Sequence, residues 1–477
     1  METIPLVVDL DGTLILTDML HESALSVLRD KPGKILGIPI WLIKGKAELK
    51  RSLALYASFE PASLPYNNEL LGWLTQQHSA GRKIVLCTAS DASIAVSIAG
   101  HLKIFDEVIA SNGCVNLAGI KKAEALEERF GGSGFDYVGN SNADLSVWKK
   151  ANHAVVVNAS SELTAKVRNI CKVERVFPRS VNRFSVWRRV LRLHQWLKNL
   201  LLFVPLLAAH EIRNLQAWTS LTVAFFSFSL CASSVYVTND LLDLEHDRIH
   251  PRKRNRPFAS GQVPVWVGVI LAPVLLLAGL VTGSFVVGTY INWLIFYFLV
   301  TCAYSWGLKR LVLIDCMTLA LLYTLRIIAG AAAVGHALSF WLLAFSVFLF
   351  LSLAFLKRYA ELGLQGSSGQ ESLHGRGYRI ADAPLIQTMG IASGYASVLV
   401  LALYLNSEAV VKLYRAPEWM WGSVTVMLFW INWAWMQAHR GKMNDDPLVF
   451  AVKDRTSLVT GVLFALAIII GAVGLPW

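Results

Sequence analysis

The sequence is poor in charged residues for its length. Asp, Glu, Lys and Arg make up 16% of its 477 residues, and the hydrophobic types make up 55%. Soluble globular proteins carry roughly 25% charged residues, so the composition argues against a soluble protein and favours an integral membrane protein. The net charge of +11 would suit nucleic acid binding, but cytoplasmic loops of membrane proteins also accumulate Lys and Arg. We expect this second origin and no nucleic acid partner.

Paired cysteines and a signal peptide are also missing. The six cysteines are scattered without a C-x-x-C pair, which argues against a zinc site and against a disulfide framework. The first residues, METIPLVVDLDGT, lack the basic flank and the apolar core of a secretory signal. We therefore expect the N-terminus to stay in the cytoplasm.

The character of the chain changes near residue 190. Before it, short apolar strands end in polar loops and alternate with helical stretches. This pattern is typical of an α/β Rossmann-like domain, in which a parallel sheet binds ligands at the carboxyl ends of its strands. We predict such a domain at 1–180 and an all-α polytopic membrane bundle at 190–477.

The second half contains about nine apolar runs that could cross a bilayer core. The loops after the even-numbered runs hold fifteen Lys and Arg residues, whereas the opposite loops hold three. The positive-inside rule then places the even loops and the N-terminal domain in the cytoplasm. We expect a multi-pass protein of the plasma membrane, the inner membrane of a bacterium. The predicted spans are 196–210, 217–238, 264–283, 287–305, 311–334, 338–356, 386–406, 418–437 and 456–476.

An acidic cluster stands at the cytoplasmic end of the second run. Asn239 and Asp240 are followed by Asp243 and Asp247, and spacings of three and four place the three carboxylates on one helical face. Three such carboxylates repel one another unless cations neutralise them, and Mg²⁺ prefers hard oxygen ligands that it shares with substrate phosphates. A solvated loop would explain the basic residues that follow but not the three spaced acids. Those basic residues can bond to the same phosphates: His250, Arg252, Lys253, Arg254 and Arg256.

This segment, N-D-x-x-D-x-x-x-D followed by HPRKRNRPFASG, resembles the first aspartate-rich motif of the UbiA superfamily of membrane prenyltransferases. The likeness extends through RLHQWLKNLLLFVPLL before it, and through YSWGLKR and DCMTLALLYTLRIIAGAAAVG after it, over roughly residues 188–477. It implies a helical bundle with a cytoplasm-facing cavity. There, Mg²⁺ on Asp240, Asp243 and Asp247 would activate a diphosphate leaving group.

The chain departs from the aromatic prenyltransferases of this superfamily after the sixth run. Those enzymes carry a second acidic motif, D-x-x-x-D, where this chain has FLKRYAELGL. The exchange of carboxylates for cations suggests a second anionic group that is bound without metal. With HGRGYR and MNDDPLVFAVKDRTS downstream, the segment is similar to the decaprenyl-phosphate phosphoribosyltransferases.

That branch implies phosphoribosyl pyrophosphate as the donor and a polyprenyl phosphate in the membrane lipid as the acceptor. Arg326 lies inside the fifth run, where an arginine is costly, and either contacts a phosphate or forms a buried ion pair with Asp315. Arg192 and Lys198 could reach the cavity or lipid headgroups. The substrate contacts that the resemblance implies are Asn239, Lys253, Arg256, Lys309, Arg326, Lys357, Arg358, Tyr359 and Glu361.

The N-terminal half carries four short motifs that resemble those of the haloacid dehalogenase superfamily, in the same order. They are VVDLDGT, LCTAS, KKAEALEERFG and YVGNSNADL. The likeness implies a phosphatase fold with a cap insertion at about 17–75. It also implies the following roles: Asp9 attacks phosphorus, Asp11 is the general acid and base, Thr88 holds a phosphoryl oxygen, Lys122 (or else Lys121) balances the acids, and Asp9, Asp11 and Asp144 hold Mg²⁺.

Asn140 occupies the place of the usual first acid of the fourth motif, so it supplies less charge to a metal. The N-terminal domain is therefore either a phosphatase, which could remove the 5-phosphate from a lipid-linked ribose, or a non-catalytic regulatory module. The alternative for the membrane half is prenyl transfer from a polyprenyl diphosphate to an aromatic acceptor. An ion pump of the P-type is disfavoured, because its D-K-T-G-T motif lacks the second aspartate that Asp11 supplies here. The polyprenyl length and the formation of homo-oligomers stay open.

Overall fold

The computed structural model describes residues 4–178, 182–366, 376–407, 414–443 and 446–474. Of the motifs above, His374, Gly375, Asn444 and Asp445 lie outside the described residues. The chain divides into two compact units, Met1–Leu191 with Tyr236–Ala272, and Arg192–Val235 with Pro273–Trp477. The boundary passes through helices α11 (Leu215–Leu242) and α13 (Val265–Ser284). The acidic segment that follows α11 therefore belongs to the unit that contains the N-terminal fold.

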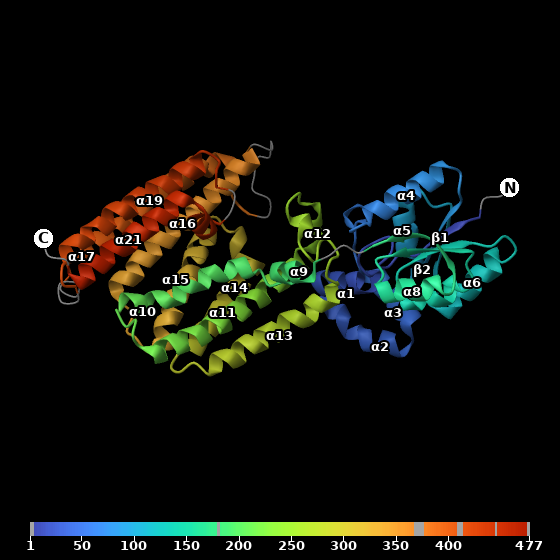
Figure 1. Cartoon of the computed structure of the whole chain (residues 1–477), viewed down its shortest axis with the longest axis horizontal. Coiled ribbons are helices and arrows are strands. Elements are labelled where there is room, and N and C mark those ends of the chain that lie inside the picture. The colour runs from blue at the N-terminus through green and yellow to red at the C-terminus, as the bar shows by residue number, and fades with distance from the viewer. Residues whose placement is uncertain (1–3, 179–181, 367–375, 408–413, 444–445, 475–477) are drawn as a thin grey trace. The chain divides into compact units, whose positions relative to one another are not determined.

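A six-stranded sheet in the order β3-β2-β1-β4-β5-β6 forms the centre of the first unit (Figure 1). All its pairings are parallel, with Leu6 of β1 beside Ile84 of β2 and Asp136 of β4. The predicted N-terminal α/β fold with a parallel sheet is confirmed. The strands are β1 Leu6–Val8, β2 Ile84–Asp91, β3 Glu107–Ser111, β4 Asp136–Gly139, β5 His153–Val157 and β6 Lys172–Phe177.

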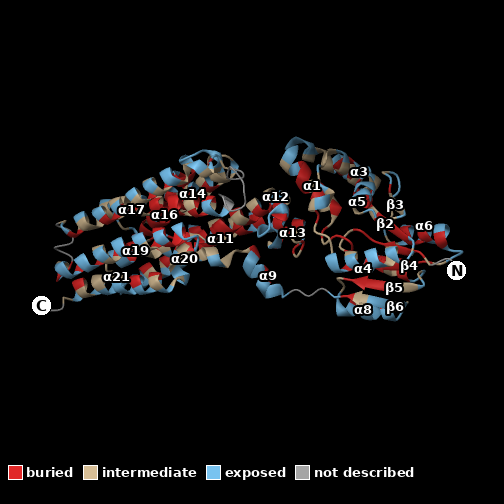
Figure 2. Ribbon diagram, turned by 90° about the horizontal axis from the view of Figure 1, so that it is seen from above, coloured by how far each residue is buried: buried red, intermediate tan, exposed pale blue. Residues whose placement is uncertain are grey.

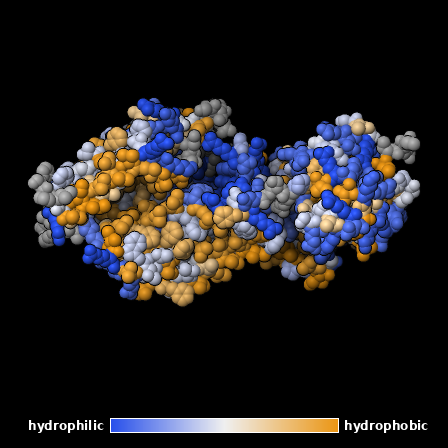
Figure 3. Space-filling model, in the orientation of Figure 1, coloured by the Kyte–Doolittle hydropathy of each residue, from blue (hydrophilic) through white to orange (hydrophobic). Residues whose placement is uncertain are grey.

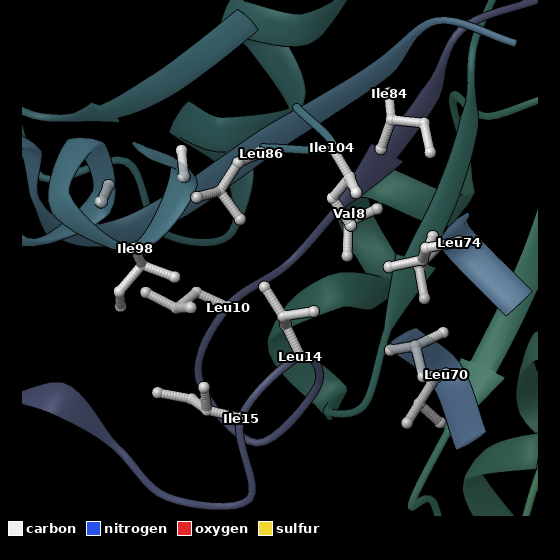
Figure 4. Packing of buried hydrophobic residues seen from close by; sticks show 14 of the residues in the cluster. Val8, Leu10, Leu14, Ile15, Leu70, Leu74, Ile84, Leu86, Ile98 and Ile104 are labelled. Carbon is white, nitrogen blue, oxygen red and sulfur yellow. The ribbon is translucent and has the colours of Figure 1, made fainter. Parts of the chain in front are cut away.

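Helices cover both faces of this sheet, which is why its central strands β1 and β5 read as nearly continuous apolar runs. Val8 joins the buried cluster with Leu70 and Ile98 on one face (Figure 4), whereas Val7 joins the cluster with Leu126 and Trp148 on the other. Figure 2 shows β5 buried and the outer faces of the helices exposed. The covering helices are α4 Asn68–Ser79, α5 Ala92–Leu102, α6 Ile120–Phe130, α7 Leu145–Trp148 and α8 Ser161–Arg168.

Three helices lie between β1 and α4, within the segment expected to be a cap. They are α1 (Met19–Asp30), α2 (Ile38–Ile43) and α3 (Lys46–Tyr56). Asp18 caps α1 by accepting a hydrogen bond from the backbone of Leu20. Val27, Leu49 and Leu53 form a small core of their own. The first unit also contains α9 (Arg183–Val190) and α12 (Leu244–Ile249).

Six of the described helices are long and apolar enough to cross a membrane, and Figure 3 shows apolar side chains gathered on the helical part. They are Leu215–Leu242, Val265–Ser284, Ile314–Val334, Phe340–Leu364, Ile380–Leu405 and Arg455–Val473. The expected number of nine is not confirmed. α14 (Tyr290–Trp306) and α19 (Trp421–His439) form at two further predicted runs but lie outside this set.

The first predicted span, 196–210, is not a continuous α-helix. It forms a 3₁₀ segment, Leu193–Phe203, followed by the short α10, Val204–Ala208. Lys198 and Asn199 within it are buried and bond to other parts of the second unit, so polar contacts shape a segment that hydropathy alone reads as a span. The remaining helices of this unit are α15 Ile314–Val334, α16 Phe340–Gly366, α17 Ala383–Leu405, α20 Pro447–Lys453 and α21 Arg455–Val473.

The 3₁₀ segment approaches α15 closely because Gly330 has no side chain. A Cβ atom at Gly330 would overlap the carbonyl oxygen of Leu202. This backbone cannot give way as the end of a flexible side chain could. Gly330 therefore sets the distance between the two elements.

We predict that Gly330→Ala lowers the free energy of unfolding by about 1–3 kcal/mol, the usual cost of overpacking. Thermal unfolding of the purified protein in detergent would measure the change. Gly363→Ala is the matched control, because that glycine also lies in a long helix and an added Cβ would meet nothing within 4 Å. Equal stability of the two variants would contradict the close approach.

Candidate functional site

The four N-terminal motifs meet at one edge of the sheet. Asp9 and Asp11 follow β1, Thr88 lies near the end of β2, and Asp144 follows β4. These strands are neighbours in the sheet, so their carboxyl ends come together. Asp9, Asp11 and Asp144 line one cavity of about 840 Å³, together with Lys122. In the sequence, Asp9 and Asp11 lie more than a hundred positions before Lys122 and Asp144.

Lys122, and not its neighbour Lys121, reaches the first aspartate. Its Nζ donates to Asp9 Oδ1 at 2.7 Å and to the hydroxyl of Tyr137 at 3.1 Å. Burial raises the pKa of Asp9 to about 7, although the ammonium of Lys122 opposes that change. Burial in turn opposes the charge of Lys122, but Asp9 raises the pKa of the ammonium above its ordinary value. The pair keeps a cation beside the atom that would attack phosphorus.

Asp11 faces the start of the cap. It accepts hydrogen bonds from the backbone of Met19 at 2.8 Å and from Ser90 Oγ at 2.7 Å. Thr88 lies 3.5 Å away through its hydroxyl. Burial raises the pKa of Asp11, which suits a group that must hold a proton during part of a reaction. Ser90 was not among the predicted residues, yet it lies only two positions after Thr88 in the same motif.

Asp144 is held within its own loop. Its carboxylate accepts from the Tyr137 hydroxyl at 2.8 Å, from the backbones of Asn140 and Ser141, and from Ser141 Oγ. Asp144 and Asp11 both help to raise the pKa of Asp9, so the cavity concentrates negative charge. In kind and charge these acids fit Mg²⁺.

The acidic segment of the transferase-like half is buried where α11 ends. Asp240 lies in the last turns of α11, and Asp243 stands at the N-cap position of α12, which carries Asp247. The three acids are therefore shared between two helices instead of one. Asp240 and Asp247 are buried. Asn239 precedes them in α11 and is half-buried.

Arg256 bridges two of these acids. Its Nη1 lies 3.0 Å from Asp240 Oδ1 and 2.5 Å from Asp247 Oδ2, and Lys253 lies 3.8 Å from Asp247 Oδ1. That buried Oδ1 atom has no hydrogen-bond partner among the described residues. Burial raises the pKa of Asp247 because it disfavours the charged carboxylate, and a bound cation would stabilise that charged form. These oxygens fit Mg²⁺, with Arg256 and Lys253 placed beside them.

Neither group of acids forms a complete metal site among the described residues. Across the described ranges, no three His, Cys, Asp or Glu side chains are grouped closely enough to hold a metal ion as they stand. In the acidic segment Arg256 forms ion pairs with Asp240 and Asp247, and in the cavity Lys122 forms an ion pair with Asp9. A cation would therefore have to share the carboxylates with these side chains.

A cationic site within the second unit is centred on Asp446. Lys198 donates to Asp446 Oδ2 at 2.6 Å, Lys357 approaches the same atom at 3.4 Å, and Tyr323 donates to Asp446 at 3.1 Å. Burial opposes the charge of Asp446, but Lys357 and Lys198 hold its pKa below the ordinary value. Arg326 lies 5.5 Å from the Tyr323 ring. The sequence predicted Lys357 and Arg326 here, and it missed Asp446.

Arg326 is not paired with Asp315, so that alternative is wrong. Its guanidinium donates to Asn199 Oδ1 at 2.9 Å, to the Tyr297 hydroxyl at 3.1 Å and to the carbonyl of Leu322. Asn199 is held in turn by Ser229 at 2.9 Å. Polar side chains therefore fix this intramembrane arginine against the 3₁₀ segment.

Asp315 pairs instead with Arg358 at 2.7 Å, and both side chains are fully buried. Arg358 also pairs with Glu361, which Arg376 contacts in turn. The sequence placed Arg358 and Glu361 in a loop, but α16 continues through both residues. Full burial in ion pairs favours a structural role for Arg358 over contact with substrate.

Two other predicted contacts lie apart from this network. The Tyr359 hydroxyl lies 2.9 Å from His439 Nδ1, and its ring packs on Trp435. Lys309 lies in the turn Leu308–Arg310 between α14 and α15. None of these contacts places either residue at the Asp446 site.

The family model of the UbiA prenyltransferase family matches residues 200–453, more than half of the chain. The matched range contains the acidic segment and most of the Asp446 site. Together with the six apolar helices, this match indicates a multi-pass membrane protein.

Three curated relatives are similar over different shares of the chain. An uncharacterized protein of Sinorhizobium fredii is 39% identical over 98% of the chain and 90% of its own length. The nodulation protein NoeC of Azorhizobium caulinodans is 37% identical over 60% of the chain and 93% of its own length. A decaprenyl-phosphate phosphoribosyltransferase of Mycolicibacterium smegmatis is 38% identical over 38% of the chain and 58% of its own length.

Solved structures are similar to each half. A UbiA homolog from Archaeoglobus fulgidus, bound to GPP and Mg²⁺, covers 60% of this chain and 97% of its own, with 16% identity and a TM-score of 0.45. A phosphoserine phosphatase covers 39% of this chain and 99% of its own, with 14% identity and a TM-score of 0.27.

We predict that Arg358→Met destabilises the protein by about 3–5 kcal/mol, because it leaves Asp315 buried without its cation. The double variant Asp315→Leu/Arg358→Met should be more stable than Arg358→Met alone, since it buries no orphaned charge. Thermal unfolding in detergent measures both. Arg310→Met, at an exposed arginine, is the control and should change stability by less than about 0.5 kcal/mol. An Arg358→Met protein as stable as this control would contradict the structural role.

Proposed function

The chain belongs to the UbiA prenyltransferase family, and on that premise we propose that it transfers 5-phosphoribose from phosphoribosyl pyrophosphate to a polyprenyl phosphate. The reaction is Mg²⁺-dependent and takes place at the cytoplasmic face of the membrane. The N-terminal domain, at about 1–180, then removes the 5-phosphate, and the domain at about 190–477 carries the transferase.

The observation that carries the transferase proposal is the cationic Asp446 site. A second diphosphate site held through metal would need carboxylates, whereas Lys198 and Lys357 converge here on a single acid. Ammonium groups bind phosphate directly, and a polyprenyl phosphate or the 5-phosphate of the donor could replace Asp446 on either lysine. Named relatives that are decaprenyl-phosphate phosphoribosyltransferases support the same choice of substrates.

The acidic segment supplies the leaving-group site in this mechanism. Bound Mg²⁺ would neutralise the diphosphate as it departs from the ribose C1. Asp240, Asp243 and Asp247 would hold that cation, and Arg256 and Lys253 would then bond to the phosphate oxygens in place of the carboxylates. The acceptor phosphate is already anionic, so no residue has to remove a proton from it. Catalysis then consists of positioning and charge stabilisation around an oxocarbenium-like carbon.

The Asp9 cavity supplies the hydrolase step. Asp9 attacks the phosphorus of the ribose 5-phosphate, the P–O ester bond breaks, and Asp11 gives its proton to the leaving alkoxide. Asp11 then removes a proton from the water that hydrolyses the aspartyl phosphate. Lys122 opposes protonation of Asp9, and Asp9, Asp11 and Asp144 are the groups that would hold Mg²⁺.

We predict that purified protein in detergent with Mg²⁺ moves label from phosphoribosyl pyrophosphate into the lipid phase when a polyprenyl phosphate is present. Asp243→Asn should reduce this transfer by about 10²–10³-fold, since it removes charge from the leaving-group site. Glu418→Gln, at an exposed acid, should leave it unchanged. Label that stays in water, with activity only on a prenyl diphosphate and an aromatic acid, would favour aromatic prenyl transfer instead.

We predict separately that the lipid product loses its ribose 5-phosphate as inorganic phosphate, and that Asp9→Asn slows this loss by about 10³-fold or more. Mass analysis of the extracted lipid distinguishes the two products. Transfer of label should survive in the Asp9→Asn variant, which makes it an internal control. Complete loss of phosphate in that variant would assign the N-terminal domain a non-catalytic role.

A further inference from the structure

The acidic segment is docked on the first helix of the cap, within the same compact unit. Arg248 of α12 donates to Glu22 of α1, from Nη2 to Oε1 at 2.6 Å and from Nη1 to Oε2 at 3.3 Å. Both side chains are buried, and Thr17 donates to Glu22 at 2.6 Å. A second pair joins the same helices, from Arg29 to Glu245 at 3.0 Å.

The two pairs have opposite polarity, and this specifies one alignment of the helices. α1 contributes an acid and, seven residues later, a base, whereas α12 contributes an acid and, three residues later, a base. Any shift along the helices would bring like charges together or leave a buried charge unpaired, which costs several kcal/mol. The contact therefore fixes the position of α12 on α1.

The chain after α12 continues this contact to the hydrolase cavity. Arg248 Nε also donates to the carbonyl of Ala259 at 3.2 Å. Gly261 follows with a φ of +70°, and a Cβ there would come within 2.6 Å of the Leu16 Cβ. The next residues of this segment line the cavity that contains Asp9: Gly261, Gln262, Pro264 and Trp266.

The cavity is larger than its chemistry requires. Its volume of about 840 Å³ is near the upper end of pockets that hold drug-sized ligands, and a pentose phosphate would fill only a fraction of it. The lining also includes apolar side chains that no phosphate needs: Leu16, Leu20, Leu42, Pro264 and Trp266. Leu42 and Trp266, the second residue of the apolar helix α13, remain about half exposed, so a partly apolar ligand would cover them.

We propose that segment 261–266 is the substrate-selecting wall of the hydrolase site, and that this wall favours phosphate monoesters with an apolar tail over small soluble esters. The inference rests on the proposed hydrolase activity. Trp266 contacts the tail, and the Glu22–Arg248 pair positions the wall without touching substrate. The transferase segment and the hydrolase site then share one stretch of chain, which presents a membrane-held product to Asp9.

The test uses two substrates that differ only in the tail, dodecyl ribofuranoside 5-phosphate and methyl ribofuranoside 5-phosphate. Full-length protein in nanodiscs with Mg²⁺ is assayed for release of inorganic phosphate. The kcat/KM for the dodecyl ester should exceed that for the methyl ester by about tenfold or more, a factor that corresponds to about 1.4 kcal/mol. Trp266→Ala should reduce this ratio to near one, chiefly through KM for the dodecyl ester. Trp187→Ala, at an exposed tryptophan outside the cavity, should retain the ratio.

The positioning pair is tested by charge exchange. Glu22→Arg and Arg248→Glu should each reduce the ratio, and the double variant Glu22→Arg/Arg248→Glu should restore at least part of it. If the single variants do not fold, Trp266→Ala still decides, because its side chain is half exposed and carries no ion pair.

Three outcomes overturn the inference, and they are distinguishable. Equal kcat/KM for both esters in the unaltered protein would contradict the substrate preference but would leave the proposed hydrolase activity intact. An unchanged ratio in Trp266→Ala assigns the preference to other residues. No phosphate release from either ester removes the proposed hydrolase activity, and the inference with it.

Discussion

Buried charge must be neutralised, and this constraint is common to the three sites described above. Lys122 pairs with Asp9 in the cavity, and Arg256 bridges Asp240 and Asp247 in the acidic segment. Arg358 pairs with Asp315, and both of these side chains are fully buried. The three pairs differ in what else can reach them. Arg358 is fully buried, so its ion pair stabilises the bundle. Lys122 lines the cavity, and Arg256 lies beside Asp247, whose Oδ1 atom has no hydrogen-bond partner among the described residues, so a phosphate or a cation can reach both places. Accessibility to solvent or ligand therefore separates the Arg358 pair from the two pairs that we propose take part in catalysis.

The proposed reactions use anions of the same kind at every step. A diphosphate leaves, a lipid phosphate attacks, and a phosphate monoester is hydrolysed. The chain meets them with different devices: carboxylates for metal in the acidic segment, ammonium groups around Asp446, and an acid pair with a lysine in the α/β fold. An ammonium binds phosphate directly, whereas carboxylates bind it only through a cation. Carboxylates therefore suit the proposed step that stabilises a leaving group through a metal ion, and ammonium groups suit the direct binding of a phosphate.

Joining the two proposed activities in one chain would be an advantage because their intermediate could not diffuse in water. A lipid-linked product stays in the membrane, and tethering raises the effective concentration of the second site. The ion pairs between α1 and α12 hold the segment that follows the acidic cluster against the Asp9 cavity, which a flexible tether would not do. The contact therefore gives that segment a defined position at the side of the cavity.

The sequence by itself determined the α/β fold, the four motifs and the acidic segment, because strand periodicity and the spacing of acids are local properties. It did not determine the number of spans, since hydropathy does not reveal that 193–203 forms a 3₁₀ segment in which Lys198 and Asn199 are buried. It placed Arg358 in a site, although charge in a sequence does not reveal burial. Only the tertiary structure brought Lys198, Lys357 and Asp446 together, because contacts between residues nearly 250 positions apart depend on how the helices pack.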